Sequence, residues 1–217
     1  MTDTTKTHLI AVAGPSCAGK TETAKAVAKR LNAPIISLDS YYIPLDHLPY
    51  EQRTRFNFDE PAAIDHELLI EQLKQLVAGH PVDVPNYDFA AYTRTSSTHR
   101  VEPAPFLLLE GLFVLCWDDL RDLCDLTVYV DAPDDLCLER RKHRDVLERG
   151  RTVESVIRQY NETVRPMAEK YVWPGKRLAE LVVSGTDSLD RCAAQVLAEI
   201  ERKSNKPVAT ATTSRFS

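Results

Sequence analysis

Gly14-Pro15-Ser16-Cys17-Ala18-Gly19-Lys20-Thr21 decides the fold, because this stretch matches the pattern G-x-x-x-x-G-K-[ST] at every fixed position. The apolar run 8–13 before it predicts a strand, and the segment 21–31 after it has apolar residues at helical spacing. Glycines let backbone N–H groups turn around phosphate oxygens, and the first turn of the helix adds partial positive charge. The stretch therefore predicts a phosphate-binding loop, or P-loop.

Two side chains of this loop have expected roles of their own. Lys20 is expected to reach the β- and γ-phosphates of a nucleoside triphosphate, and the Thr21 hydroxyl to ligate Mg²⁺. Residues 14–19 are expected to bind phosphate mainly through their backbone. The alternative is a glycine-rich turn that only caps a helix, but eight positions and both flanks favour the P-loop. The motif does not distinguish a kinase from another nucleoside triphosphatase.

The bulk composition is that of a globular protein of one α/β domain, with 217 residues, 43% apolar and 27% charged. A net charge of −5 argues against a dedicated nucleic-acid binder. No apolar run approaches the ~20 residues that span a membrane, and the first residues lack the apolar core of a secretory signal. The five cysteines show no disulfide or metal spacing, which favours reduced thiols in a cytoplasmic protein.

Strand and helix patterns alternate along the chain, which predicts a parallel sheet with helices on both faces. A single domain is expected over 1–203, and the segment 204–217, rich in Ser, Thr and Ala, is expected to be a disordered tail. Further strands are predicted at 34–38, 106–109, 126–130 and 181–183, and further helices at 64–77 and 187–200.

Carboxylates follow two of these strands. Asp39 comes after the second strand and Glu110 after the run 106–109. Ligands of open parallel sheets bind at the carboxyl ends of the strands, so both acids should lie near the P-loop. Asp39 is expected to accept the proton of an attacking hydroxyl or to help hold the metal, and Glu110 to orient Mg²⁺ through water. The alternatives are a turn or helix-cap residue for Asp39 and a chance acid for Glu110.

The segment 140–151 is strongly basic, with six Arg or Lys against two acids. A solvated helix face is the usual explanation of such a cluster. If the segment is helical, however, Arg141 and Arg144 share a face, and Arg149 and Arg151 flank a turn that can fold over a triphosphate. Arginines at the transferred group are a recurring device of phosphoryl transfer. We therefore expect an Arg-rich helical lid over about 133–172.

Two aromatic clusters, 56–59 and 87–89, each contain a carboxylate, and the sequence places both in loops. Aromatic rings suit stacking on a planar base, and a carboxylate suits the paired hydroxyls of a ribose. Packing in the core is the default alternative for such rings.

Taken in order, these elements resemble the uridine kinase (uridine–cytidine kinase) family over about residues 9–183. The matching elements are 14–21, Asp39-Ser40-Tyr41-Tyr42, Asn57-Phe58-Asp59-x-Pro61, Pro85-x-Tyr87-Asp88-Phe89 with Arg94, Leu109-Glu110-Gly111, Arg140-Arg141-x-x-Arg144-Asp145, Glu148-Arg149-Gly150-Arg151, Gln159-Tyr160 and Val164-Arg165-Pro166-Met167. The resemblance implies a P-loop kinase fold of class α/β, with a five-stranded parallel sheet, a small β-hairpin on the acceptor side and the lid.

The resemblance also implies an activity. It implies Mg²⁺-dependent transfer of the γ-phosphoryl group of ATP, or GTP, to the 5′-hydroxyl of a pyrimidine ribonucleoside, as in pyrimidine salvage. The partner would be this small nucleoside, with no nucleic acid and no membrane, and the chain would form a homo-oligomer, a tetramer or dimer.

Carried over position by position, the resemblance makes Asp39 the general base and places Asp59 and Arg141 on the ribose hydroxyls. Arg144 and Arg149 become lid arginines on the triphosphate. The residues it places around the base are Tyr87, Phe89, Tyr92, Arg151 and Gln159.

Three positions depart from the family pattern. Tyr92 stands where the family commonly has the His that reads the 4-substituent of the pyrimidine, so cytidine is favoured over uridine only if the phenol oxygen acts as an acceptor. Ser184-Gly185-Thr186-Asp187 replaces Pro-Arg-Gly-Gly, which leaves ATP or GTP open, and Glu60 replaces a His beside the ribose site. The alternatives are a kinase of another alcohol, similar to phosphoribulokinase or pantothenate kinase, and a nucleotide-binding module without catalysis.

Overall fold

A computed structural model describes residues 7–204, and its centre is a five-stranded sheet in the order β2-β5-β1-β6-β7. The strands are β1 (His8–Ala13), β2 (Ile35–Ser37), β5 (Phe106–Glu110), β6 (Leu126–Asp131) and β7 (Leu181–Ser184). Every neighbouring pair in this sheet is parallel. The α/β class and the five-stranded sheet are confirmed. Apart from Ser204, the tail predicted as disordered lies outside the described residues.

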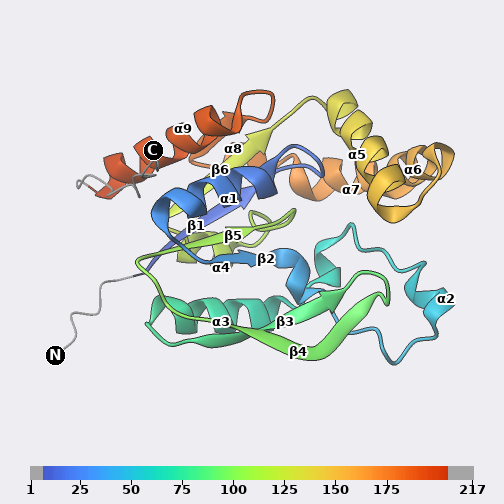
Figure 1. Ribbon diagram of the computed structural model, residues 1–217, viewed down its shortest axis with the longest axis horizontal. Helices are drawn as coiled ribbons and strands as arrows, with labels where there is room; N and C mark the ends of the chain where they lie inside the picture. The colour runs from blue at the N-terminus through green and yellow to red at the C-terminus, as the bar shows by residue number, and fades with distance from the viewer. Residues whose placement is uncertain (1–6, 205–217) are drawn as a thin grey trace, which may run out of the picture.

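One face of the sheet is covered by α1 (Lys20–Leu31) and α9 (Leu189–Ser204) (Figure 1). Both helices place small or branched side chains against β1 and β6: Ala24 and Val27 from α1, and Ala193 and Val196 from α9, are fully buried. The apolar stripes found in the sequence are therefore the packing faces, although α9 continues to Ser204 beyond its predicted end.

The opposite face is covered by α3 (His66–Val77), by α4 (Asp118–Leu123), and by a separate two-stranded antiparallel sheet of β3 (Val82–Asp88) and β4 (Thr93–Val101) (Figure 1). Leu69, Leu73 and Leu76 of α3 are fully buried against this side. The hairpin expected from the resemblance is present. The placement of 87–89 in a loop was wrong for Tyr87 and Asp88, because both pair with β4 at the end of β3.

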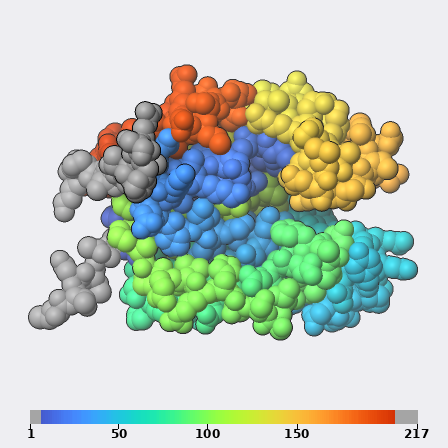
Figure 2. Space-filling view, in the orientation of Figure 1, coloured from blue at the N-terminus to red at the C-terminus, as the bar shows by residue number. Residues whose placement is uncertain are grey.

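Between β6 and β7 the chain leaves the sheet and forms a helical excursion at one end of the molecule (Figure 1). It contains α5 (Asp134–Arg149), α6 (Val153–Gln159), α7 (Arg165–Met167) and α8 (Gly175–Leu178), with π-helical turns at Tyr160–Val164 and Ala168–Val172. Figure 2 shows this excursion, coloured yellow to orange, at the same end as the cyan loop that carries α2 (Tyr50–Arg53). Within residues 7–204, no helix has the length and apolar character needed to cross a bilayer.

The strand β2 is shorter than predicted, because the chain turns after Ser37 into a 3₁₀-helix at Leu38–Tyr41. A further 3₁₀-helix lies at Pro61–Ala63. The first of these turns packs directly against Gly111, where a Cβ atom would lie 2.3 Å from Cβ of Leu38. Since Gly111 follows Glu110 and Leu38 precedes Asp39, this close contact draws the two predicted acids toward each other.

We expect Gly111→Ala to lower the free energy of unfolding by about 1–3 kcal/mol, the usual penalty of overpacking. The added methyl would overlap Leu38, so the turn that carries Asp39 must move. Urea unfolding followed by circular dichroism measures the change. The matched control is Gly175→Ala in α8, where the nearest atom to the new Cβ is 3.4 Å away, and where stability should stay constant or rise by up to about 1 kcal/mol. Equal effects of both variants would contradict the prediction.

Candidate active site

The P-loop joins β1 to α1 at the carboxyl edge of the sheet, as the motif predicts. Gly14 has a φ of +151°, and a Cβ atom on it would lie 2.5 Å from the Val130 carbonyl oxygen, so only glycine fits there. Inside the loop the Ala18 N–H donates to the Pro15 carbonyl at 3.1 Å. Lys20 is the first residue of α1, and its side chain starts at the helix N-terminus. The loop therefore has the backbone that phosphate binding requires.

Glu110 joins three strand ends. It lies opposite Val12 of β1 and Ser37 of β2, and its side chain is buried at 5% exposure. The Thr21 hydroxyl donates to its Oε2 at 3.0 Å, and the Ser37 hydroxyl donates to its Oε1 at 2.8 Å. Glu110 and Thr21, both predicted to act at the metal, are thus in direct contact. Ser37 was not singled out from the sequence.

The donor set here fits Mg²⁺, because Thr21 and Glu110 offer a hydroxyl and a carboxylate beside the phosphate loop. Mg²⁺ is usually held by one or two such groups together with the phosphates of its nucleotide. Among residues 7–204, no group of three or more His, Cys, Asp or Glu side chains is arranged to hold a metal ion.

Asp39 lies in the 3₁₀-helix after β2, and its side chain is half-buried. Burial raises the pKa of this carboxyl above its ordinary value, and the negative charge of Glu110 raises it further. Lys20, Arg149 and Arg144 act in the opposite direction on the same pKa. The Asp39 carboxyl therefore lies within electrostatic reach of the P-loop lysine and of two arginines of the helical excursion.

An aromatic cluster lies next to Asp39. Tyr42 contacts Phe58 and Tyr87, each with 5.2 Å between ring centroids, and Phe58 stacks on Tyr92 at 5.9 Å. Phe89 contacts Tyr87 at 5.2 Å but is 54% exposed, so it stands at the rim. The hydroxyl of Tyr87 is buried without a hydrogen-bond partner among the described residues, and burial raises its pKa. A ligand placed here would meet aromatic faces and one phenol in need of a partner.

The turn that carries Tyr92 is held in a strained conformation, since this residue has a φ of +54°. Arg53 of α2 fastens the turn: its guanidinium donates to the carbonyls of Leu48 at 2.7 Å, Asp46 at 2.9 Å and Ala91 at 3.3 Å. Sequence reasoning missed Arg53, because a lone arginine in a short loop has no distinguishing pattern. Tyr92 therefore faces Phe58 from a fixed position.

Asp59 lies in the loop before the 3₁₀-helix Pro61–Ala63, within electrostatic reach of arginines of the helical excursion. Burial raises the pKa of its carboxyl, while the positive charge of Arg141 lowers it. Arg141 is itself only 6% exposed, and it donates to the Ser16 hydroxyl at 3.2 Å. This arginine thus bridges the P-loop and the region of Asp59.

The remaining arginines of the excursion are close together as well. Gln159 accepts hydrogen bonds from Arg141, at 3.4 Å, and from Arg151. Arg144 and Arg149 both form ion pairs with Asp145, which is fully buried. The basic cluster is therefore not a plain solvated face. Sequence reasoning counted Asp145 as an acid within a basic run and as part of the matching element Arg-x-x-Arg-Asp, but gave it no role.

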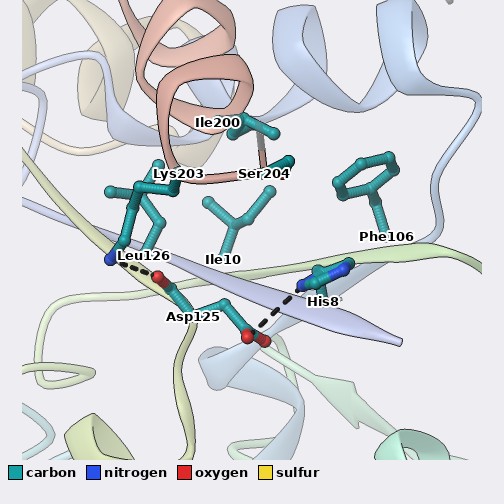
Figure 3. A pocket seen from close by; sticks show the side chains of 8 residues that line it. All are labelled: His8, Ile10, Phe106, Asp125, Leu126, Ile200, Lys203 and Ser204. Carbon is teal, nitrogen blue, oxygen red and sulfur yellow. Dashed lines mark hydrogen bonds and ion pairs between the residues drawn. The ribbon is translucent and has the colours of Figure 1, made fainter. Parts of the chain in front are cut away.

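A cavity of about 130 Å³ lies elsewhere, beside the amino ends of β1 and β6 and the end of α9 (Figure 3). It is lined by Ile10, Leu126 and Ile200, and at its margin His8 Nδ1 lies 3.3 Å from Asp125 Oδ1. None of the predicted site residues contributes to it. The predicted site residues lie instead around the P-loop, at the carboxyl edge of the sheet.

Sequence comparison gives a consistent result. Residues 9–190 match the family described as Phosphoribulokinase / Uridine kinase family. A uridine kinase of Chloroflexus aurantiacus is 44% identical over 196 residues, which cover 89% of this chain and 94% of that protein. A uridine kinase of Streptococcus uberis is 42% identical over 207 residues, which cover 91% and 99%.

Solved structures share the fold at low identity. D-glycerate 3-kinase from Cryptococcus neoformans has a TM-score of 0.60 and 17% identity, covering 84% of this chain and 88% of that one. Shikimate kinase from Bacteroides thetaiotaomicron has a TM-score of 0.52 and 18% identity, covering 89% and 98%. At such identities these structures support the fold alone.

We expect Asp39→Asn to stabilise the folded chain at neutral pH. The folded-state pKa of Asp39 lies above the ordinary value of 3.8, so folding binds a proton between these two values. The contribution of Asp39 to the free energy of unfolding therefore falls as pH rises from 3.8 through the folded-state pKa, and it stays lower above that pKa. Asparagine removes this penalty. In urea unfolding from pH 3 to 8, the advantage of the variant should grow as pH rises.

The control for this experiment is Asp122→Asn, which removes an exposed carboxylate of α4 and should change stability by less than about 0.5 kcal/mol. An advantage of Asp39→Asn that is absent, or constant over pH, would show that the carboxyl is not destabilised by its surroundings.

Proposed function

This chain belongs to the Phosphoribulokinase / Uridine kinase family, and from that premise we propose that it transfers the γ-phosphoryl group of ATP to the 5′-hydroxyl of a pyrimidine ribonucleoside. The observation that carries the proposal is the placement of Asp39 in the field of Lys20, Glu110 and two lid arginines, next to an aromatic cluster. Relatives named uridine kinase, at 42–44% identity over most of the chain, support the nucleoside acceptor.

The donor side consists of the P-loop and the lid. The backbone of residues 14–19 and the ammonium group of Lys20 bind the phosphates, and Arg144 and Arg149 approach them from the lid. We take 133–172 as this lid, because it holds the arginines and leaves the sheet between β6 and β7. When bound through Thr21, with Glu110 next to it, Mg²⁺ would neutralise charge on the phosphate oxygens. ATP is proposed over GTP as the common donor.

The acceptor side consists of the loop 56–59, the β3–β4 hairpin and the lid. Asp59 and Arg141 bind the two ribose hydroxyls, an arrangement supported by the effect of Arg141 on the pKa of the Asp59 carboxyl. The residues proposed around the base are Tyr87, Phe89, Tyr92, Arg151 and Gln159. The aromatic faces stack on the base, and the unpartnered Tyr87 hydroxyl gains a hydrogen-bond partner from it.

The chemical step follows from the positions of these groups around the two substrates. The 5′-oxygen attacks the γ-phosphorus, the bond from that phosphorus to the β–γ bridging oxygen breaks, and ADP leaves. Asp39 accepts the proton of the 5′-hydroxyl, while Lys20 and the lid arginines stabilise the charge on the transferred group. Closure of the lid excludes water, which would otherwise take the phosphoryl group. The product, a nucleoside 5′-monophosphate, fits a role in pyrimidine salvage.

Cytidine is the proposed preferred acceptor. Tyr92 can donate to a 4-oxo group or accept from a 4-amino group. The Tyr87 hydroxyl belongs to the same aromatic cluster as Tyr92, and it has no hydrogen-bond partner among the described residues. If Tyr92 donates its proton toward Tyr87, its own oxygen is left as an acceptor, which suits the amino group of cytidine.

The proposed activity predicts ADP release with cytidine and uridine in a coupled assay, and little with deoxyribonucleosides or non-nucleoside alcohols such as glycerate and shikimate. Asp39→Asn should lower turnover by ~10²–10⁴-fold, the usual contribution of a general base, while ATP still binds. Near-normal turnover of this variant would remove Asp39 from the mechanism. Activity only with another alcohol, or ATP binding with no turnover on any acceptor, would overturn the proposal in favour of a different kinase or a non-catalytic module.

Tyr92→His should shift the ratio of kcat/KM for cytidine over uridine toward uridine by about 2- to 10-fold, the value of one net hydrogen bond. The neutral imidazole offers an N–H donor to the 4-oxo group, which a tyrosine acting as acceptor does not. Both nucleosides are measured with the same preparation. A uniform fall in activity at a constant ratio would show that Tyr92 has only a structural role.

A further inference from the structure

Asp145 has no task in the proposed reaction, yet it occupies the centre of the lid. Its side chain has 0% exposure, and four arginines lie within ion-pair distance of it. They are Arg141, Arg144, Arg149 and Arg151. A buried carboxylate persists only when it is well paired, so this arrangement is a built feature of the lid.

The two oxygens of Asp145 face different arginines. Oδ1 accepts from Arg144, at 2.9 Å from Nε and 2.8 Å from Nη2, and lies 3.7 Å from Nε of Arg149. Oδ2 lies 3.5 Å from Nε of Arg141 and 3.7 Å from Nη1 of Arg151. Each oxygen thus holds one pair. The Oδ1 pair is the one proposed for the triphosphate, and the Oδ2 pair is the one proposed for the nucleoside.

Asp145 holds its two arginine pairs with contacts of different strength. Oδ1 has hydrogen bonds of normal length from Arg144, whereas Oδ2 has no hydrogen bond among the described residues, and neither has Nε of Arg141. The contacts of Oδ2, at 3.5 and 3.7 Å, are ion pairs without hydrogen-bond geometry. The nucleoside-side pair is therefore attracted to Asp145 but not fixed by it, and a ligand can shorten these contacts.

The backbone of Asp145 also contacts the turn that carries Arg149 and Arg151. The carbonyl of Asp145 accepts from the N–H of Gly150, which ends α5, and from the N–H of Arg151 at 3.1 Å. Movement of the turn 149–151 therefore changes the surroundings of both carboxylate oxygens together. Without the central negative charge, four guanidinium groups would repel one another at this spacing.

We propose that Asp145 is a positioning residue that couples the binding of the two substrates, an inference that rests on the proposed function. A ligand that orders one arginine pair fixes the shared carboxylate, so the other substrate finds its own pair already ordered. Binding of the first ligand then includes the free-energy cost of ordering the arginines. The second ligand does not have this cost, so it binds more tightly.

The test measures affinity for a non-hydrolysable ATP analogue by calorimetry, without and with saturating cytidine. In the wild type, cytidine should tighten analogue binding by roughly 5- to 150-fold, the usual range of coupling between sites. In Asp145→Asn, which keeps the shape but removes the charge, this ratio should fall toward one. A merely structural role would weaken both affinities and leave the ratio unchanged, which would overturn the inference.

The matched control is Glu139→Gln, which removes one exposed charge from the same helix and should keep the wild-type ratio. Should Asp145→Asn not fold, as judged by circular dichroism, Asp145→Glu takes its place. It keeps the charge but displaces the oxygens by one methylene group, so the ratio should be reduced but remain above one. An unchanged ratio in this variant, or a ratio of one in the wild type, would overturn the inference.

Turnover of the wild type with cytidine and uridine distinguishes a failure of the coupling role from a failure of the proposed function. Normal turnover with an unaltered ratio in Asp145→Asn removes the coupling role alone. Analogue binding without any nucleoside binding or turnover removes the proposed function, and the coupling role with it.

Discussion

The hydrogen bonds that Thr21 and Ser37 donate to Glu110 are the constraint on which the site depends. They connect the helix of the P-loop, the end of β2 and the end of β5, three points far apart in sequence that parallel pairing brings to one edge. Glu110 is buried, so an oxygen without a donor would be costly. Each of its two oxygens has one. Gly111 then lets Leu38 approach, and the turn that follows places Asp39 over the same edge.

Two acidic side chains near the sheet and the arginines of the helical excursion carry opposite charges. Asp39 and Asp59 are acids whose burial raises their pKa, and arginines of the helical excursion act against that shift in both cases. These acids and the arginines of the helical excursion therefore attract one another. Asp145 opposes the accumulation of positive charge within the lid itself.

Local signals predicted much of this architecture. The P-loop, the buried strands, α3 and α9 each have a pattern readable within a dozen residues. The hairpin has none, because β4 is a polar and largely exposed strand, and only the resemblance indicated it. The excursion after α5 is divided by π-helical turns, which break the helical period. Tyr87 and Asp88 were misplaced because strand pairing, not their own residue types, extends β3 to them.

By itself, the sequence determined the P-loop, the alternation that makes the sheet parallel, and the acids that follow its strands, since each depends on neighbours along the chain. Tertiary structure alone decided which arginine faces which oxygen of Asp145, how Arg53 fixes the turn of Tyr92, and that Ser37 and Thr21 share Glu110. The arginine contacts of Asp145 all lie within the stretch 141–151, whereas the hydrogen bonds to Glu110 join residues 73 and 89 positions apart and the contact of Arg53 with Ala91 spans 38 positions. Their energies depend on distance and burial, which exist only once the sheet has brought the segments together.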